Sequence, residues 1–145
     1  MITSMNHTGF VVKDLDKSLA FYTEVVGLQL NSRGETEGGP VGQIVGYDDS
    51  HLKLASLRIG AEGGHVLELI EYVRPASADR PTEERAVLGA SHLAFNVTDM
   101  EGTFQRLLDA GAIKLNPPVE VRGGRMACYL QDPDGNWIEL VGTRD

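Results

Sequence analysis

Cysteine is almost absent from this 145-residue chain, and its single thiol, Cys128, excludes an intramolecular disulfide. The first ten residues, MITSMNHTGF, show neither the basic nor the apolar region of a secretory signal peptide. We therefore expect a cytoplasmic protein.

Long apolar runs and clustered positive charges are also missing. No apolar run approaches the roughly 20 residues that a membrane-spanning helix needs. The chain has 13 Lys and Arg against 21 Asp and Glu, a formal net charge of −8, whereas nucleic-acid binding depends on clustered Lys and Arg. These absences argue against a membrane protein and against a nucleic-acid binder.

An internal repeat is present, and it appears when His7 is placed over His92 at an offset of 85 residues. In both halves a strand-like segment precedes an Asp that is a plausible helix N-cap, then an apolar stripe at helical spacing and a closing glycine. The stripe Leu15, Leu19 and Tyr22 has its counterparts in Met100, Phe104 and Leu107, the caps are Asp14 and Asp99, and the helices end at Gly27 and Gly111.

Three strand-like segments follow each helix. They are residues 28–34, 51–60 and 65–73 in the first half, and residues 112–121, 125–132 and 136–143 in the second. The sequence therefore predicts an α+β fold of tandem βαβββ units, the first over residues 1–73 and the second over 90–145. Residues 74–89, which contain Pro75 and Pro81, are the predicted linker.

The two units differ in length after the helix. Asp132–Asn136 predicts a tight turn, because Pro133 presets φ and Gly135 supplies a positive φ, and this turn fixes the position of Glu139. Since Glu68 precedes Glu139 by only 71 residues, the first unit has 14 extra residues, which we assign to the glycine-rich stretch 34–50. That stretch is either a binding loop or lid, or a floppy surface insertion.

Each unit also places a His on its first strand and a Glu on its last. Glu68 and Glu139 lie in the apolar runs VLELI and WIELV, where a buried carboxylate must be paired, bound to metal or turned to a solvated face. Strand alternation puts Glu71 on the opposite face from Glu68, and we interpret Glu71 as solvated or substrate-facing.

The two imidazoles of His7 and His92 and the two carboxylates of Glu68 and Glu139 make an N₂O₂ donor set. Such a set suits Zn²⁺, Ni²⁺, Co²⁺, Mn²⁺ or Fe²⁺, and octahedral coordination would leave two positions for water or substrate. We therefore predict a divalent-metal site formed by these four residues.

Several other polar residues fit a simpler interpretation. His51 and His65 have no repeat partner and flank turns, which favours surface positions. Cys128 in MACYL is typical of a small core residue. Arg122 and Arg125 could hold an anion beside Gly123-Gly124, although solvated turn arginines are the preferred interpretation.

The segments HTGFVVKDLDKSLAFYTEVVGL and DPDGNWIELV resemble the opening strand and helix and the closing hairpin of the vicinal oxygen chelate superfamily. This superfamily includes glyoxalase I, methylmalonyl-CoA epimerase, extradiol dioxygenases and bleomycin-resistance proteins. The resemblance covers nearly the whole chain and implies curved mixed sheets that form a cleft, a small-molecule substrate and a homodimer. It also implies that His7, Glu68, His92 and Glu139 are the metal ligands.

The resemblance leaves the reaction open between two enzyme classes and a binding protein. A glyoxalase I-like lyase or isomerase would remove a proton next to a carbonyl to give an enediolate or enolate, with Glu139 as the base or, second, Glu68. An extradiol dioxygenase is the runner-up, although such enzymes use two His and one Glu around Fe²⁺ and carry no carboxylate at the position of Glu68. A resistance protein that sequesters a small molecule is the third possibility.

Overall fold

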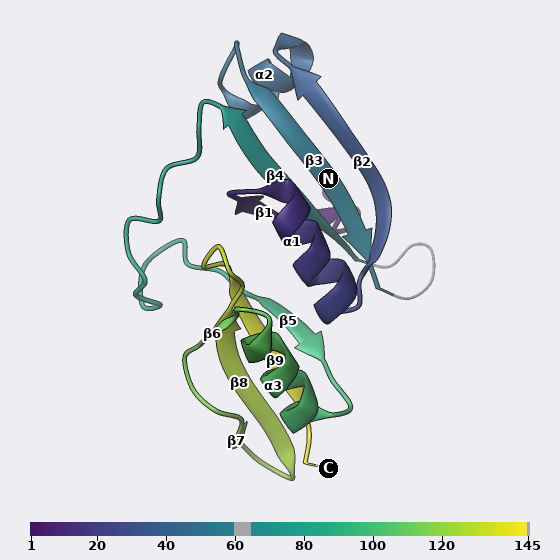
Figure 1. Ribbon diagram of the computed structural model, residues 1–145, viewed down its shortest axis with the longest axis vertical. Coiled ribbons are helices and arrows are strands. Elements are labelled where there is room, and N and C mark those ends of the chain that lie inside the picture. The colour runs from purple at the N-terminus through teal and green to yellow at the C-terminus, as the bar shows by residue number, and fades with distance from the viewer. Residues whose placement is uncertain (60–64, 145) are drawn as a thin grey trace. The chain divides into compact units, whose positions relative to one another are not determined.

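A computed structural model of the chain describes residues 1–59 and 65–144. The chain divides into two compact units, Met1–Asp79 and Arg80–Asp145, and each unit has its own sheet and helix (Figure 1). No helix within these described residues is long and apolar enough to cross a bilayer.

The first unit contains one four-stranded sheet of order β1-β4-β3-β2, in which β1 is parallel to β4 and the other neighbours are antiparallel. Its elements are β1 (His7–Val12), α1 (Leu15–Ala20), a π-helical turn η1 (Phe21–Val25), β2 (Gln29–Glu37), α2 (Gly39–Val45), β3 (His51–Arg58) and β4 (Val66–Arg74).

The second unit repeats this order as β5-β9-β8-β6, with β7 also paired to β8, and β5 is parallel to β9. Its elements are β5 (Leu93–Asn96), α3 (Met100–Asp109), β6 (Ile113–Lys114), β7 (Val119–Glu120), β8 (Arg125–Gln131) and β9 (Trp137–Thr143). The matching strand order confirms the α+β class and the repeated arrangement of strands and helix.

Helices α1 and α3 begin at the predicted caps. The Asp14 carboxylate accepts hydrogen bonds from the backbone N–H groups of Asp16 and Lys17, and Asp99 accepts one from Gly102 at 2.8 Å. These bonds satisfy N–H groups that have no partner inside a helix.

Each helix covers one face of its own sheet and buries the predicted apolar stripe against it (Figure 1). The buried residues of the first unit include Leu15, Leu19, Tyr22, Leu67 and Leu69, and those of the second include Met100, Phe104, Leu107, Ile138 and Leu140. Because alternate strand residues point to opposite faces, Glu68 and Glu139 lie on the face opposite the helix, which we call the far face.

Two predicted segments differ from the structure. Residues 112–121 do not form one strand, because Pro117 and Pro118 have no N–H group for a ladder and separate β6 from β7. The stretch 34–50 is not an irregular loop, because β2 continues to Glu37 and α2 follows. Helix α2 has Pro40 in its first turn and ends at Gly46, which has a φ of 78°.

The closing turn has the predicted form. Gly135 has a φ of 87°, and the Asp132 carboxylate accepts hydrogen bonds from the backbone N–H groups of Asp134 and Asn136. This turn sets the register of β8 against β9, in which Gln131 lies opposite Trp137 and Tyr129 lies opposite Glu139.

Candidate functional site

The two His–Glu pairs occupy the same position in their sheets. Gly9 lies opposite Glu68 across the parallel β1–β4 pair, and His7 precedes Gly9 by two residues. In the second unit Ala94 lies opposite Glu139, and His92 precedes Ala94 by two residues, immediately before the first residue of β5. Residues two apart on a strand share a face, as do directly opposite residues. The imidazole and the carboxylate of each unit therefore project from the same far face.

The side chains of each pair are in contact. The distance from Nε2 of His7 to Oε2 of Glu68 is 3.5 Å, and the distance from Nε2 of His92 to Oε2 of Glu139 is 3.1 Å. The two glutamates are 28% and 20% exposed, so neither carboxylate is fully solvated. The structure thus brings each predicted histidine to its predicted glutamate within a unit. Among residues 1–59 and 65–144, no group of three or more His, Cys, Asp or Glu side chains is gathered as a metal would require.

The donor atoms of each pair are spaced as ligands of one ion would be. Nitrogen and oxygen donors bind metals such as zinc at about 2.1 Å, so two neighbouring donors lie about 3.0 Å apart at a right angle and about 3.4 Å apart in a tetrahedron. The observed separations of 3.1 and 3.5 Å agree with these values. Each pair therefore fits two neighbouring positions around a divalent ion.

The surroundings of the first pair are hydroxylic and small. Ser56 lies opposite Glu68 on β3, and its hydroxyl oxygen is 2.7 Å from that of Ser32 and accepts a hydrogen bond from the side-chain amide of Asn31. The other ring nitrogen of His7, Nδ1, lies 2.7 Å from the side-chain oxygen of Asn6. The residues that hydrogen bond around this pair are therefore uncharged, whereas Arg58, two residues after Ser56, shares its face and lies opposite Val66.

The surroundings of the second pair are aromatic and cationic. Tyr129 occupies the position opposite Glu139 that Ser56 occupies in the first unit. Its hydroxyl lies 3.4 Å from Nε2 of His92, and the two rings meet edge to face at 5.1 Å. The Arg85 guanidinium carbon lies 3.9 Å from the centre of the Tyr129 ring. Burial raises the pKa of Tyr129, the negative charge of Glu139 raises it further, and Arg85 opposes the shift.

Sequence reasoning missed both Tyr129 and Arg85. The predicted turn at Asp132–Asn136 contained the signal for Tyr129, because pairing outward from that turn places Tyr129 opposite Glu139. Arg85 lies in the irregular segment before β5, where no periodicity points to a site.

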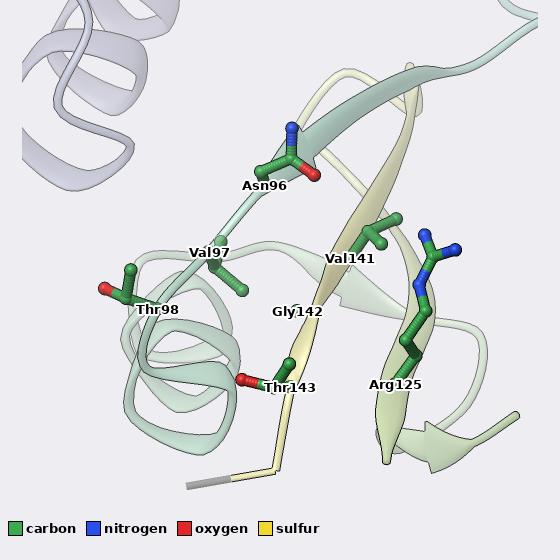
Figure 2. Close-up of a pocket in the computed structure, with 7 residues that line it drawn as sticks. All are labelled: Asn96, Val97, Thr98, Arg125, Val141, Gly142 and Thr143. Atoms are coloured by element: carbon green, nitrogen blue, oxygen red, sulfur yellow. The ribbon is translucent and has the colours of Figure 1, made fainter. Parts of the chain in front are cut away.

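A pocket of about 390 Å³ lies near the ends of β5 and β9 in the second unit. Figure 2 shows that Asn96, Val141 and Arg125, from three neighbouring strands, line it. Val141 follows Glu139 by two residues and therefore shares its face. The part of the pocket lined by Val141 therefore lies on the same face as the Glu139 side chain.

The arginines beside the Gly123-Gly124 turn are both exposed. Arg122 agrees with the preferred interpretation of a solvated turn residue. Arg125 is also exposed but belongs to β8 and lines the pocket.

Glu71 is neither solvated nor substrate-facing, so that interpretation is wrong. Its carboxylate accepts hydrogen bonds from the backbone N–H of Leu15 at 2.7 Å and from the Lys53 ammonium group at 3.1 Å, and its side chain is 16% exposed. It binds the first residue of α1, where a helix favours negative charge. The same contact raises the pKa of Lys53.

The remaining predictions have mixed outcomes. His65 is exposed, as predicted, and its ring lies 2.8 Å from the Thr8 hydroxyl. His51 is not a simple surface residue, because its side chain is 19% exposed and lies between the carboxylates of Glu35 and Glu37. Cys128 is buried, and burial raises its pKa to about 11, which agrees with an inert core thiol.

Comparison with known proteins identifies relatives over nearly the whole chain. The chain is 32% identical over 140 residues to a probable lactoylglutathione lyase of Vibrio cholerae, covering 95% of this chain and 89% of the relative. It is 28% identical over 146 residues to a 2-epi-5-epi-valiolone epimerase of an Actinomyces species, covering 95% and 78%. Both relatives are named as enzymes.

A solved structure has the same fold throughout. A glyoxalase family protein from Bacillus cereus superposes with a TM-score of 0.89 at 26% identity, covering 100% of this chain and 97% of that one. The family model for the glyoxalase/bleomycin resistance protein/dioxygenase superfamily matches residues 4–140. The chain therefore belongs to the glyoxalase/bleomycin resistance protein/dioxygenase superfamily.

Proposed function

We propose that the protein is a divalent-metal-dependent lyase or isomerase of the glyoxalase I kind, acting on a small carbonyl compound. One observation carries this proposal: the His–Glu pair recurs at the same register on the far face of both sheets. A carboxylate inside a strand is costly to keep unless it has a partner. The His–Glu pair occurs at the same position in both units. This recurrence favours a ligand that both pairs bind over two unrelated ion pairs.

The proposed metal ligands are His7, Glu68, His92 and Glu139. Their nitrogen and oxygen donors suit Zn²⁺, Ni²⁺, Co²⁺, Mn²⁺ or Fe²⁺. When bound, such an ion acts as a Lewis acid that makes a C–H bond next to a carbonyl easier to ionise. The lyase and epimerase relatives are consistent with chemistry of this type.

The proton transfer itself is assigned to the carboxylates of this chain. Glu139 is the proposed base: one of its oxygens takes the proton from the carbon next to the carbonyl, and the electron pair moves onto the carbonyl oxygen. In an isomerisation the same carboxylate returns the proton to the neighbouring carbon, while the hydroxyl proton of the first carbon passes to the former carbonyl oxygen. An epimerisation would need a second acid on the other face of the same carbon, and Glu68 is the proposed candidate for that role. A carboxylate has lone pairs on both oxygens, so it can act as a ligand and as a base. Glu68 is the second candidate.

The substrate and the assembly are parts of the same proposal. Glyoxalase-like chemistry would use a hemithioacetal of glutathione, and epimerase-like chemistry a 2-acyl-CoA thioester. A homodimer is expected from the family resemblance, and light scattering of the purified protein would measure it.

An extradiol dioxygenase is less well supported. Such enzymes leave the position of Glu68 without a carboxylate, whereas here Glu68 is present and contacts His7. A sequestering protein differs from both enzymes by its lack of turnover.

The deciding experiment measures the metal content of protein purified without added metal and without a metal-binding tag. We expect near-stoichiometric metal in the wild type and its loss in His7→Ala and Glu139→Ala. His65→Ala and Glu120→Ala are matched controls, because both residues are exposed and belong to neither pair. They should retain the metal.

The measurement also has a clear negative outcome. Wild-type protein that contains no metal and takes up none of Zn²⁺, Ni²⁺, Co²⁺, Mn²⁺ or anaerobic Fe²⁺ would exclude the metalloenzyme and favour the sequestering protein. Retained metal would justify a screen of hemithioacetals, acyl-CoA epimers and catechols, in which turnover of a catechol alone would favour the dioxygenase.

A further inference from the structure

Arg85 is held on the far face of the second sheet by two aromatic rings. Its guanidinium carbon lies 3.9 Å from the centre of the Tyr129 ring and 4.6 Å from the centre of the Trp137 ring. Both distances are within the range of a cation–π contact. The side chain is half-buried, so Arg85 is not a freely moving surface arginine.

The segment that carries Arg85 is fixed at a second point nearby. The carboxylate of Glu83 accepts a hydrogen bond of 2.7 Å from the side-chain amide of Gln131, which lies opposite Trp137 on β8. Trp137 precedes Glu139 by two residues and therefore shares its face. The Arg85 guanidinium is thus anchored on the surface from which the Glu139 carboxylate projects.

The positive charge of Arg85 is not neutralised by a neighbouring carboxylate. Within residues 1–59 and 65–144 its side chain makes ring contacts but forms no ion pair or hydrogen bond. A guanidinium has five N–H donors, and its contacts with the two rings form no hydrogen bond to any of them. In a chain with a formal net charge of −8, an unpaired cation beside the candidate site is the feature an anionic ligand would need.

We propose that Arg85 binds an anionic group of the substrate, a carboxylate or a phosphonate-like group, next to the carbon from which Glu139 takes its proton. A planar guanidinium matches the two oxygens of such a group. Because Tyr129 and Trp137 already hold the side chain, little of its conformational freedom remains to be lost on binding. The role of the anion as part of a substrate rests on the proposed function, whereas anion binding at Arg85 does not.

The test follows the one indole N–H signal of the protein by NMR, since Trp137 is the only tryptophan and lies against Arg85. Metal-free wild-type protein is titrated with pyruvate, with methylphosphonate and with the neutral ester methyl pyruvate. We expect saturable shifts with a Kd in the millimolar range for at least one anion and no saturable shift for the ester. The two anions distinguish a carboxylate from a phosphonate site.

Three variants identify the residue responsible. Arg85→Gln should weaken anion binding by about tenfold or more, because a charged hydrogen-bond donor is lost. Arg85→Lys keeps the charge without the planar fork, and binding should be intermediate. Arg122→Gln is the matched control: it removes the same charge from an exposed turn and should leave the Kd unchanged.

The proposal is overturned by any of three results: no saturable shift in the wild type with either anion, an equal shift with methyl pyruvate, or the same Kd in Arg85→Gln as in the wild type. The wild-type titration decides the first two even if Arg85→Gln folds poorly, and Arg85→Lys then tests the residue. Because the protein is free of metal, failure here is distinct from failure of the metal site, which the metal analysis measures separately.

Discussion

The two halves of this protein carry the same pair of side chains in different surroundings. His7 and Glu68 lie among hydroxyl and amide groups, with Ser56 opposite the glutamate. His92 and Glu139 lie beside Tyr129, with Arg85 stacked on its ring. Glu68 and Glu139 have the same register against the first strand of their sheets, whereas the side chains around them differ.

The difference in surroundings suggests that the two pairs have one role in common, metal binding, and that they differ in their role towards the substrate. The repeated His–Glu geometry suits the metal ligation that we propose for the two pairs. Tyr129 takes the position that Ser56 occupies in the first unit, and Arg85 contacts its ring. These two residues suit the substrate recognition and proton transfer that we propose. The comparison therefore predicts that the two pairs contribute similarly to metal affinity and differently to turnover.

The largest effect is expected from the glutamates. In metal-saturated protein acting on the substrate that the screen identifies, Glu139→Gln should lower kcat by about 10²–10⁴, because the proposed general base is lost. Glu68→Gln should lower kcat less while reducing metal affinity to a similar extent. Steady-state kinetics with metal titration would measure both.

Two outcomes would break this asymmetry. Equal losses of kcat would mean that the carboxylates act only as ligands, and a larger loss for Glu68→Gln would move the base to the first unit. His65→Ala serves as the control for a histidine outside both pairs.

Truncating equivalent core residues should destabilise the two units to a similar extent. Leu69 and Leu140 are one residue beyond Glu68 and Glu139, and both are buried. Truncating either to Ala should lower the free energy of unfolding by about 2–5 kcal/mol, because a cavity replaces packed methyl groups. Urea unfolding followed by circular dichroism measures the change, and the exposed Val119→Ala should have an effect within about 0.5 kcal/mol. A large difference between the two leucines would show that the cores are not equivalent.

The helix caps differ in the number of bonds that they accept. Asp14 accepts two backbone N–H groups and Asp99 one, so Asp14→Asn should lower the Tm more than Asp99→Asn at neutral pH. The hydrogen bond from the Lys17 N–H holds the pKa of Asp14 below its ordinary value of 3.8. A carboxyl with a lower pKa in the folded state adds stability above its unfolded pKa and loses it as the pH falls through the folded pKa.

The Tm difference between wild type and Asp14→Asn should therefore shrink as the pH is lowered from neutral to below the folded pKa of Asp14. Thermal unfolding over that range tests this sign. A difference that stays constant with pH would show that the charge of Asp14 has no part in capping.

The smallest expected change in stability is that of Gly9→Ala, at the position equivalent to Ala94 in the second unit. A Cβ at Gly9 would meet only the Ile70 side chain, at an ordinary distance of 3.7 Å. Gly9→Ala should therefore raise the free energy of unfolding by about 0.5–1 kcal/mol, because the unfolded chain loses freedom. In contrast, a Cβ at Gly142 would lie 2.6 Å from the Val97 carbonyl oxygen, so Gly142→Ala should destabilise. If Gly9→Ala destabilised the protein as Gly142→Ala does, the equivalence of Gly9 and Ala94 would be contradicted.

Much of this arrangement follows from local patterns in the sequence. The offset between His7 and His92 predicts the repeat, and the capping aspartates and closing glycines predict where the helices start and end. Strand alternation correctly separates the face of Glu68 from that of Glu71. It does not reveal the partner of Glu71, because that requires knowing which helix end packs on the opposite face.

Other features depend on contacts between segments far apart in the sequence. The segment of Arg85 has no periodicity, and only packing places its side chain on Tyr129 and Trp137. Helix α2 also escaped prediction, because glycine and proline in residues 38–46 are typical of loops. Here Pro40 suits the first turn of a helix, and Gly42 lies where a Cβ would come within 2.8 Å of the Tyr47 carbonyl oxygen.

The position of Trp137 has a consequence for how the molecule can be observed. All tryptophan emission comes from the unit Arg80–Asp145, where the indole packs under a guanidinium. Fluorescence therefore follows the unfolding of that unit and receives no tryptophan signal from Met1–Asp79, whereas far-ultraviolet circular dichroism records both units. Coincident transitions would indicate one cooperative unit, and separate transitions would show that the two halves unfold independently.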